Sequence, residues 1–269
     1  MNEAAVAFRM DAYLDRVGYT GERTPTREVL EELHLAHATH IPFENLDILL
    51  GRPIRLDLES LQAKLVEGRR GGYCFEHNTL FAAVLEQLGF PVTRLAARVR
   101  LGATRVSPRT HMLLEVEAEG GPYLADVGFG GEGLLRPLAL RPDQVTRQFG
   151  RDFRLAQAGG HWVLQSRQGS TWLDYYAFTR EPQYPADFEV ANHYTSTYPA
   201  SHFVKTLTAQ RQTPEARFVL RGREFTVVRG GEESRRMIEG DESLLQVLSE
   251  VFGLHLPPGT RFPGPGGFG

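Results

Sequence analysis

The hydrophobic periodicity of this 269-residue chain changes from helical to strand-like near Gly89. Before this glycine, apolar residues recur every three or four positions, which is the spacing of an amphipathic helix. After Pro91, apolar and polar residues alternate, as in the stretch 94–101, and this places successive side chains on opposite faces of a strand. A chain of this length, with helices first and strands after them, predicts an α+β fold of two or three units.

Glycines and capping residues set the expected bounds of the individual elements. Four helices are expected before the change of period: from Met10 to a stop at Gly18, from a cap at Thr24-Pro25, from Leu58 to Gly68, and from Cys74 to Gly89. After it we expect strands at 94–101, 111–118, 153–155 and 162–164, a hairpin over 217–228, a closing helix capped by Asp241, and a disordered tail from Pro257.

Cys74 is the only cysteine of the chain, and its neighbours favour a reactive thiol. Arg69 and Arg70 add positive charge before it, two glycines follow them, and the helical pattern begins at the cysteine itself. The thiol therefore lies at a helix start, where unpaired N–H groups and the helix dipole favour an anion. The thiolate is the nucleophilic form of cysteine. A buried structural cysteine is the alternative, because free cysteine is among the most buried residue types.

A cysteine nucleophile needs a base, and the base needs an orienting group. His111 begins an alternating strand that turns near a glycine pair, and the returning strand carries Asp126. A turn centred on Gly120-Gly121 places Asp126 opposite Glu115, about 13 Å from His111 along the strand. A turn centred near residues 118–119, or a bulge, brings the two side chains together. The spacing thus permits a His–Asp pair, and a hydrogen-bonded structural histidine is the alternative.

Five segments, in order over most of the chain, resemble the motifs of the arylamine N-acetyltransferase family. They are Ile41–Asp47, Arg70–Glu76, Thr110–Met112, Asp126–Gly130 and Asn192–Pro199. The resemblance implies that Cys74, His111 and Asp126 correspond to the family's Cys–His–Asp triad. It also implies that the three side chains are arranged as in cysteine proteases. One departure is His193, which stands where members usually have an aromatic residue, so one wall of the cleft is expected to differ.

The resemblance also implies an architecture and a chemistry. The expected units are a helical domain over residues 1–90 with the nucleophile, a β-barrel over 91–190 with the histidine and aspartate, and an α/β lid over 191–269. Acetyl-CoA would be the co-substrate, an arylamine or arylhydrazine the acceptor, and an acetyl-cysteine the intermediate of a ping-pong reaction without a metal. The residues implied to line the cleft, for which plain core packing is the alternative, are Phe43, Val99, Phe129, Gly130, Gly131 and Phe203.

Three other functions stay open at this point. A thiol hydrolase, of the peptidase or transglutaminase-like kind, shares the chain order Cys, His, Asp but would be indifferent to acetyl-CoA. An amide synthase of the same family would act on a polyketide-type acyl intermediate. A binding module with a vestigial site would leave Cys74 inert to an alkylating agent.

Two further motifs are weaker. The segment Gly128–Gly133 fits the glycine pattern of dinucleotide-binding loops, but the proline-broken sequence after it predicts no helix. His34, His37 and His40 recur every three residues, yet no cysteine lies beside them and the proposed chemistry needs no zinc. We interpret His34 and His37 as half-buried helix residues, and Glu44 as a buried carboxylate bonded to backbone near the site.

Composition agrees with a cytoplasmic enzyme. The formal net charge of −3 argues against a general affinity for nucleic acid or anionic membranes. One cysteine excludes an intramolecular disulfide, as expected in a reducing compartment. Neither a signal peptide nor a run of 18 apolar residues is visible, so no membrane association is expected. The oligomeric state stays open.

Overall fold

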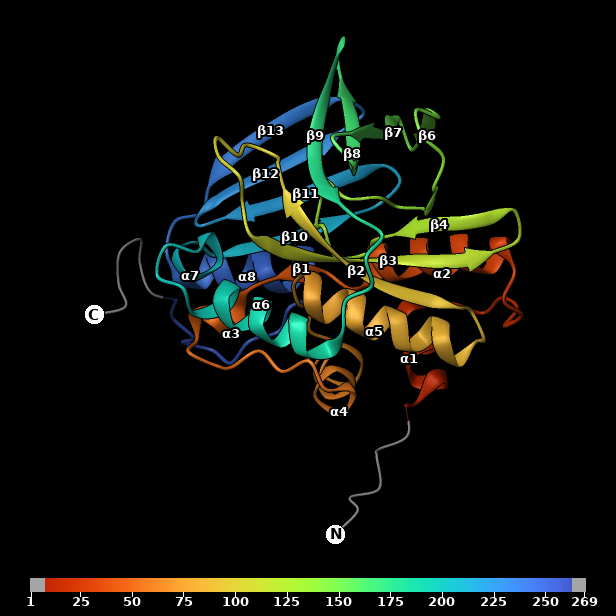
Figure 1. Ribbon diagram of the computed structural model, residues 1–269. Helices are drawn as coiled ribbons and strands as arrows, with labels where there is room; N and C mark the ends of the chain where they lie inside the picture. The colour runs from red at the N-terminus through yellow and green to blue at the C-terminus, as the bar shows by residue number, and fades with distance from the viewer. Residues whose placement is uncertain (1–7, 263–269) are drawn as a thin grey trace.

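The computed structural model describes residues 8–262 and combines two antiparallel sheets with helices packed around them. Figure 1 shows the helices before residue 90 gathered below the sheets, with α5 crossing the middle of the molecule. The helices are α1 (Met10–Val17), α2 (Arg27–His40), α3 (Leu46–Leu49), α4 (Leu58–Leu61), the π-helix η1 (Gln62–Glu67), α5 (Cys74–Gln87), α6 (Pro185–Thr197), α7 (His202–Lys205) and α8 (Asp241–Phe252).

The larger sheet has eight strands in the order β5-β4-β3-β2-β9-β8-β7-β6. An isolated bridge between Pro142 and Leu155 joins the segment after β5 to β7, so the sheet is a nearly closed barrel. Its strands are β2 (Val92–Val99), β3 (Arg109–Ala118), β4 (Gly121–Ala125), β5 (Leu138–Ala139), β6 (Thr146–Gln148), β7 (Arg151–Ala158), β8 (His161–Gln168) and β9 (Thr171–Phe178).

The smaller sheet joins distant parts of the chain. Its order is β1-β10-β11-β12-β13, so β1 from the first fifty residues pairs with β10 near residue 210. The strands are β1 (Phe43–Glu44), β10 (Thr208–Gln212), β11 (Ala216–Arg221), β12 (Glu224–Arg229) and β13 (Glu232–Met237). The closing helix α8 covers this sheet through a separate apolar cluster that includes Leu220, Leu244 and Phe252.

Most expected elements are confirmed, and the differences have local causes. Gly18 ends α1 in the left-handed conformation, as expected. The second helix is capped by the side chain of Thr26 rather than by Thr24. Asp241 does not cap α8 with its side chain, because its carboxylate pairs with Arg223. The expected disordered tail is wrong for residues 257–262, since Phe262 packs against the α8 cluster, and from residue 263 it lies outside the described residues.

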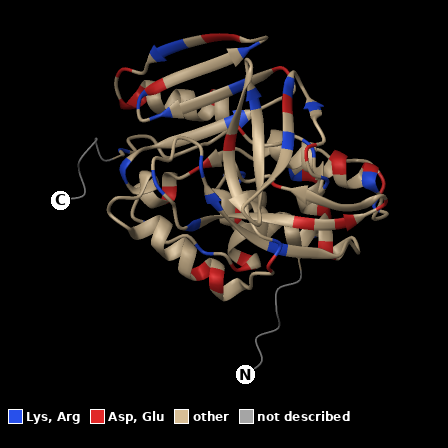
Figure 2. Ribbon diagram, turned by 45° about the horizontal axis from the view of Figure 1, so that its top comes forward, with Lys and Arg blue, Asp and Glu red and all other residues tan. Residues whose placement is uncertain are grey.

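The boundary expected at residues 190/191 falls inside α6, which begins at Pro185. The chain leaves the larger sheet at Phe178, and the segment 179–184 connects it to α6. Basic and acidic residues alternate along the ribbon in Figure 2. Within residues 8–262, every helix is too short or too polar to span a lipid bilayer.

Candidate active site

Cys74 is the first residue of α5, so the expected helix start is confirmed. The carboxylate of Glu76 accepts a hydrogen bond from the Tyr73 N–H at 3.0 Å, which closes the first turn. The thiol is 4% exposed, and its Sγ lies 3.6 Å from the carbonyl oxygen of Thr110 on β3. The nucleophile candidate is therefore held between the helical part of the chain and the larger sheet.

Arg70, one of the two arginines before Cys74, does not supply free charge to the thiol, contrary to expectation. Arg70 forms ion pairs with the buried carboxylates of Glu44 and Asp47, at 2.7 and 3.3 Å. Arg69 takes a left-handed backbone conformation, and its carbonyl accepts from the buried guanidinium of Arg16 at 3.5 Å. These contacts fix the loop before the helix. The interpretation of Glu44 is confirmed, because its carboxylate accepts from the backbone N–H of Leu46 at 2.7 Å.

His111 and Asp126 are in direct contact. The Nε2–H of His111 donates to Oδ2 of Asp126 at 2.7 Å, and both side chains are buried. The register of the hairpin explains this contact, because Ala118 pairs with Gly121 and the turn therefore consists of residues 119 and 120. If this register is extended by one residue, Asp126 becomes the diagonal neighbour of His111 on the same face of the sheet. Long side chains can contact each other across such a diagonal.

Asn78, which the sequence analysis missed, holds Asp126 in place from α5. Its amide donates to Asp126 Oδ1 at 3.1 Å and to the Met112 carbonyl at 2.8 Å, while its oxygen accepts from Val127 N–H at 3.2 Å. Asn78 lies four residues, or about one helical turn, after Cys74. This spacing puts both side chains on one face of the helix, and it was the sequence signal that could have identified Asn78. Oδ1 of Asp126 also accepts from the Gly128 N–H at 3.0 Å.

The electrostatics of the pair favour a charged histidine. Burial disfavours the imidazolium, but the Asp126 carboxylate outweighs this and, with hydrogen bonds to Asp126 and Cys74, raises the pKa of His111 to about 10. Burial likewise opposes ionisation of Asp126, while His111 and the bonds from Asn78 and Gly128 lower its pKa. Because Nε2 is bound to Asp126, Nδ1 is the nitrogen that can take a proton from Cys74.

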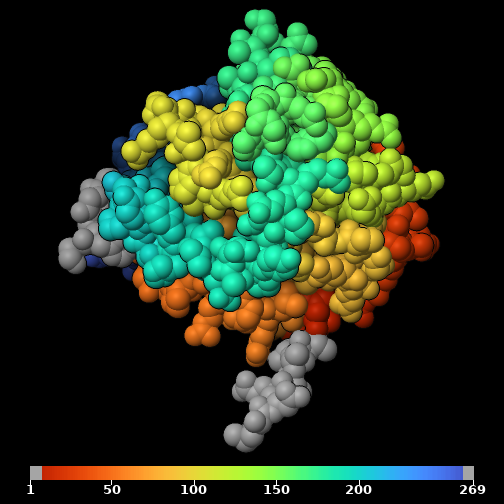
Figure 3. Space-filling view, viewed as in Figure 1, coloured from red at the N-terminus to blue at the C-terminus, as the bar shows by residue number. Residues whose placement is uncertain are grey.

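A cavity of about 450 Å³ contains Cys74 and His111. In Figure 3 the segment 100–110 (yellow) and the segment 190–205 (cyan) lie next to each other on the face above it. Aromatic rings form much of the wall: the centroids of Phe43 and Phe203 are 5.9 Å apart, and Phe129 stands edge-on to His111 at 5.1 Å. The cleft thus offers flat apolar surfaces beside a thiol.

Of the six residues expected to line the cleft, four border this cavity: Phe43, Val99, Phe129 and Phe203. Gly130 and Gly131 are not among the described residues that line it. Instead the Gly131 N–H donates to Gln210 Oε1 at 2.7 Å, so that edge of the loop faces β10. The expected effect of His193 is not seen either, because its side chain is exposed and its neighbours Tyr194 and Thr195 border the cavity.

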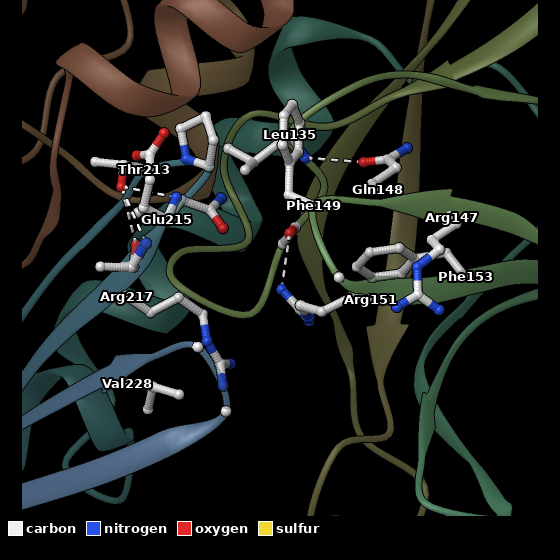
Figure 4. Close-up of a pocket in the computed structure, with 17 residues that line it drawn as sticks. Leu135, Arg147, Gln148, Phe149, Arg151, Phe153, Thr213, Glu215, Arg217 and Val228 are labelled. Carbon is white, nitrogen blue, oxygen red and sulfur yellow. Dashed lines mark hydrogen bonds between the residues drawn. The ribbon is translucent and has the colours of Figure 1, made fainter.

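A second cavity of about 550 Å³ borders the end of the glycine loop, which we define as residues 128–133 (Figure 4). It is lined by Arg147, Phe149 and Arg151 on the barrel side and by residues of β11 and β12 on the other. Cys74 and His111 are not among its lining residues. Among residues 8–262, no group of three or more His, Cys, Asp or Glu side chains is placed to hold a metal ion.

Comparison with known proteins agrees with this geometry. A family model described as N-acetyltransferase matches residues 26–260. The arylamine N-acetyltransferase of Mycobacterium tuberculosis H37Rv is 42% identical over 93% of this chain and 91% of its own length. The chain belongs to the arylamine N-acetyltransferase family. The arylamine N-acetyltransferase of Escherichia coli K12 is 40% identical, over 91% of this chain and 88% of its own.

Solved structures of arylamine N-acetyltransferases share the whole fold. The M. tuberculosis structure has a TM-score of 0.89 at 42% identity and covers 91% of this chain and 94% of its own. The Mycobacterium marinum enzyme in complex with CoA has a TM-score of 0.87 at 39% identity, covering 91% and 93%. The mixed helix-and-sheet architecture with a barrel-like sheet is therefore that of the arylamine N-acetyltransferase family.

His34 and His37 are fully buried rather than half-buried as expected, and hydrogen bonds join His37 to Tyr13 and His77 beneath the cleft. The hydroxyl of Tyr13 donates to His37 Nδ1, and His37 Nε2 donates to His77 Nδ1, each at 2.9 Å. His77 Nε2 in turn donates to the Pro42 carbonyl at 3.2 Å, and a carbonyl can only accept. Burial lowers the pKa of both rings and so favours their neutral forms, and with neutral rings the Pro42 acceptor sets the direction of every hydrogen bond in this series. Phe43 of the cleft stacks on His77.

These histidines predict a loss of stability in acid. Burial lowers the pKa of His34 and His77 to about 4 and that of His37 well below its usual value. The unfolded chain binds these protons near pH 6.5 and the folded one does not, so their contribution to stability is fully present above pH 6.5 and falls as the pH decreases toward 4. We expect His34 and His77 each to lower the free energy of unfolding by about 2 kcal/mol between pH 6.5 and 5, and His37 to act in the same direction.

Urea denaturation at pH 7, 6 and 5 measures this loss. His77→Gln, which has no proton to gain, should be less stable at pH 7 but should show a shallower decline. The exposed His193→Gln is the matched control and should follow the wild-type curve. A wild-type stability that stays level from pH 7 to 5 would contradict the assignment of neutral buried rings.

Proposed function

We propose that this protein transfers an acetyl group from acetyl-CoA to an arylamine or arylhydrazine through an acetyl-cysteine at Cys74. The observation that carries the proposal is one aromatic-walled cavity bordered by a helix-start thiol and by a histidine bonded to a buried carboxylate. Family membership supports the reaction class, and the M. marinum relative has been solved in complex with CoA.

In the first half-reaction, Nδ1 of His111 accepts the Cys74 proton, and Asp126 stabilises the imidazolium. The thiolate then attacks the thioester carbonyl of acetyl-CoA, and backbone N–H groups at the start of α5 stabilise the oxyanion. The bond to the CoA sulfur breaks, the imidazolium returns a proton to that sulfur, and free CoA leaves. The acetyl group remains as a thioester on Cys74.

In the second half-reaction, the aromatic amine enters the same cavity. Its nitrogen attacks the acetyl-cysteine while His111 removes a proton from it, and the thiolate of Cys74 leaves. The rings of Phe43, Phe129 and Phe203 suit a flat aromatic acceptor, because aromatic pairs gain from offset or edge-on packing. No step requires a metal. A Salmonella typhimurium relative is named arylamine N-acetyltransferase / N-hydroxyarylamine O-acetyltransferase.

The three-part division belongs to the same proposal, with one boundary moved. A helical unit to residue 90 carries Cys74, a barrel unit carries His111 and Asp126, and a third unit from about residue 185 closes the cleft with α6, α7 and the smaller sheet. We place the protein in the cytoplasm, because a reactive thiol without a disulfide partner suits a reducing compartment.

Incubation with acetyl-CoA alone tests the proposal. Without an acceptor the reaction should stop at the thioester, because such a thioester hydrolyses slowly unless water is activated. One acetyl group, about 42 Da, should therefore appear on Cys74 with release of one CoA per active site. An arylamine should then discharge the adduct, and initial rates with both substrates varied should give parallel reciprocal plots.

The rival functions give different results in this experiment. A thiol hydrolase or an amide synthase acting on another acyl donor would show neither the stable adduct nor its discharge by an amine. Turnover with intersecting plots and no mass increase would mean direct transfer in a ternary complex, and the role proposed for Cys74 would then be wrong.

A further inference from the structure

Glu132, in the glycine loop, contacts three separate strands. Its carboxylate pairs with Arg217 of β11 through Oε1, and with Arg151 of β7 through Oε2 at 3.3 Å. The hydroxyl of Tyr175 on β9 donates to Oε2 at 3.0 Å. One side chain thus joins the loop, the barrel and the smaller sheet.

Packed aromatic rings connect the Glu132 contacts to His111, the proposed base. The ring of Tyr175 stacks on Phe129, with centroids 5.4 Å apart and planes 17° from parallel. Phe129 in turn stands edge-on to His111 at 5.1 Å. Because Glu132 fixes the Tyr175 hydroxyl, it also limits how far Phe129 and the imidazole can shift.

The same loop touches the nucleophile. A side chain at Gly128 would come within 2.8 Å of the Cys74 Cα, so the loop backbone lies directly against the first residue of α5. Four glycines in six residues give this segment much conformational freedom. Its conformation is therefore set by outside contacts, which include Gln210 on β10 and the Glu132 cluster.

Glu132 supplies the one negative charge that Arg151 and Arg217 share. Arg151 and Arg217 border the second cavity (Figure 4), whereas Glu132 borders the cavity of Cys74. All three side chains are partly buried, with 22%, 24% and 30% exposed respectively, so their charges are screened less than at an open surface. Without the carboxylate, the guanidinium groups of Arg151 and Arg217 would lose their shared counter-charge, and their repulsion would act to separate β7 from β11. The loop would also lose its tie to both strands.

We propose that Glu132, paired with Arg151 and Arg217, is a positioning residue for acetyl transfer: it holds the loop so that Phe129 and His111 keep their orientation toward Cys74. This inference rests on the proposed function. Glu132 touches neither Cys74 nor His111 and acts through Tyr175 and Phe129. The positioning is imposed by the smaller sheet, because Arg217 belongs to β11.

The test compares Glu132→Gln, Arg217→Met, the double variant and the conservative Arg217→Lys. Single-turnover acetylation by acetyl-CoA gives the maximal rate and the half-saturating concentration separately. We expect Glu132→Gln and Arg217→Met each to lower the maximal rate about tenfold, since small misplacements of catalytic groups have effects of this order or more. The half-saturating concentration should stay within about threefold, because the lost orientation matters in the transition state.

Two further results separate positioning from simple stabilisation. The double variant should be no slower than the slower single variant, because both remove one contact. Arg217→Lys should recover most of the rate by restoring a positive charge. Glu86→Gln is the matched control, since Glu86 also binds an arginine through both oxygens, at the far end of α5. The maximal acetylation rate of Glu86→Gln should equal that of wild type.

Unchanged acetylation rates in Glu132→Gln at a temperature where it is fully folded would overturn the inference, as would single effects that multiply in the double variant. The pH dependence of Cys74 alkylation by iodoacetamide keeps this test separate from the proposed function. If wild type forms no acetyl-enzyme, the proposed function fails. In that case the positioning role is still tested by alkylation. It would be disproved if Cys74 of Glu132→Gln is alkylated by iodoacetamide with the same pH dependence as Cys74 of wild type.

Discussion

Replacing Cys74 by alanine should abolish acetyl transfer and leave the fold intact. The chain has no other thiol that could take over. We expect a loss of at least about 10⁴-fold, the scale seen when a nucleophile of a catalytic triad is removed. Cys74→Ser should fail as well, because a hydroxyl is far less acidic than a thiol and is not activated by the same base.

The fold of both variants is checked by circular dichroism and thermal unfolding. Losing one buried sulfur should change stability by about 1 kcal/mol, a small part of the stability of a domain. Wild-type protein alkylated at Cys74 by iodoacetamide should be equally inactive, and prior acetylation by acetyl-CoA should protect it. Full activity of Cys74→Ala would end the hypothesis of a covalent intermediate.

Asp126→Asn should cost about 10²–10⁴-fold in transfer, for a reason visible in the hydrogen bonds. Oδ1 of Asp126 faces two donors, Asn78 Nδ2 and the Gly128 N–H, so the amide of the variant must keep its oxygen there. The NH₂ group then faces Nε2 of His111, which must accept. The imidazole proton moves to Nδ1, and that nitrogen can no longer take a proton from Cys74.

The measurement is the rate of acetylation by acetyl-CoA, followed by CoA release across a range of pH. Asp174→Asn is the matched control, because Asp174 bonds a basic group, Arg100, on the outside of the same sheet at 3.0 Å. It should leave the rate unchanged. A rate of Asp126→Asn within threefold of wild type would show that another group orients His111.

The sequence predicted α1, α2, α4, α5, α8 and the central strands, because their patterns are local, whereas α3, α6 and α7 were missed. Gly18 and the alternation after Pro91 need no distant partner to be interpreted. The pairing of His111 with Asp126 was left open, because a shift of one residue in the turn moves every partner along the strand. Only the structure shows the turn at residues 119 and 120.

The missed features depend on contacts between distant segments. β10 and β13 have the polar sequences TAQRQ and EESRRM, which carry too few apolar residues to indicate a strand. Asn78 is one amide within a helix, and its role follows only once β3 and the segment after β4 meet it. The charge of Arg70 was misjudged for the same reason, since Glu44 and Asp47 approach it from another part of the fold.

The pairing of β1 with β10 has a consequence for how the protein is made. Synthesis delivers residues 43–45 some 160 residues before their partners, yet Asn45 bonds the carbonyls of Phe203 and Thr206 and the N–H of Thr208. The cleft wall at Phe43 therefore lacks its contacts with β10 and Phe203 while the nascent chain is shorter than about 210 residues. Domains fold progressively from the N-terminus on the ribosome, so the Cys74 thiol is synthesised early. The cavity beside it is completed only near the end of translation.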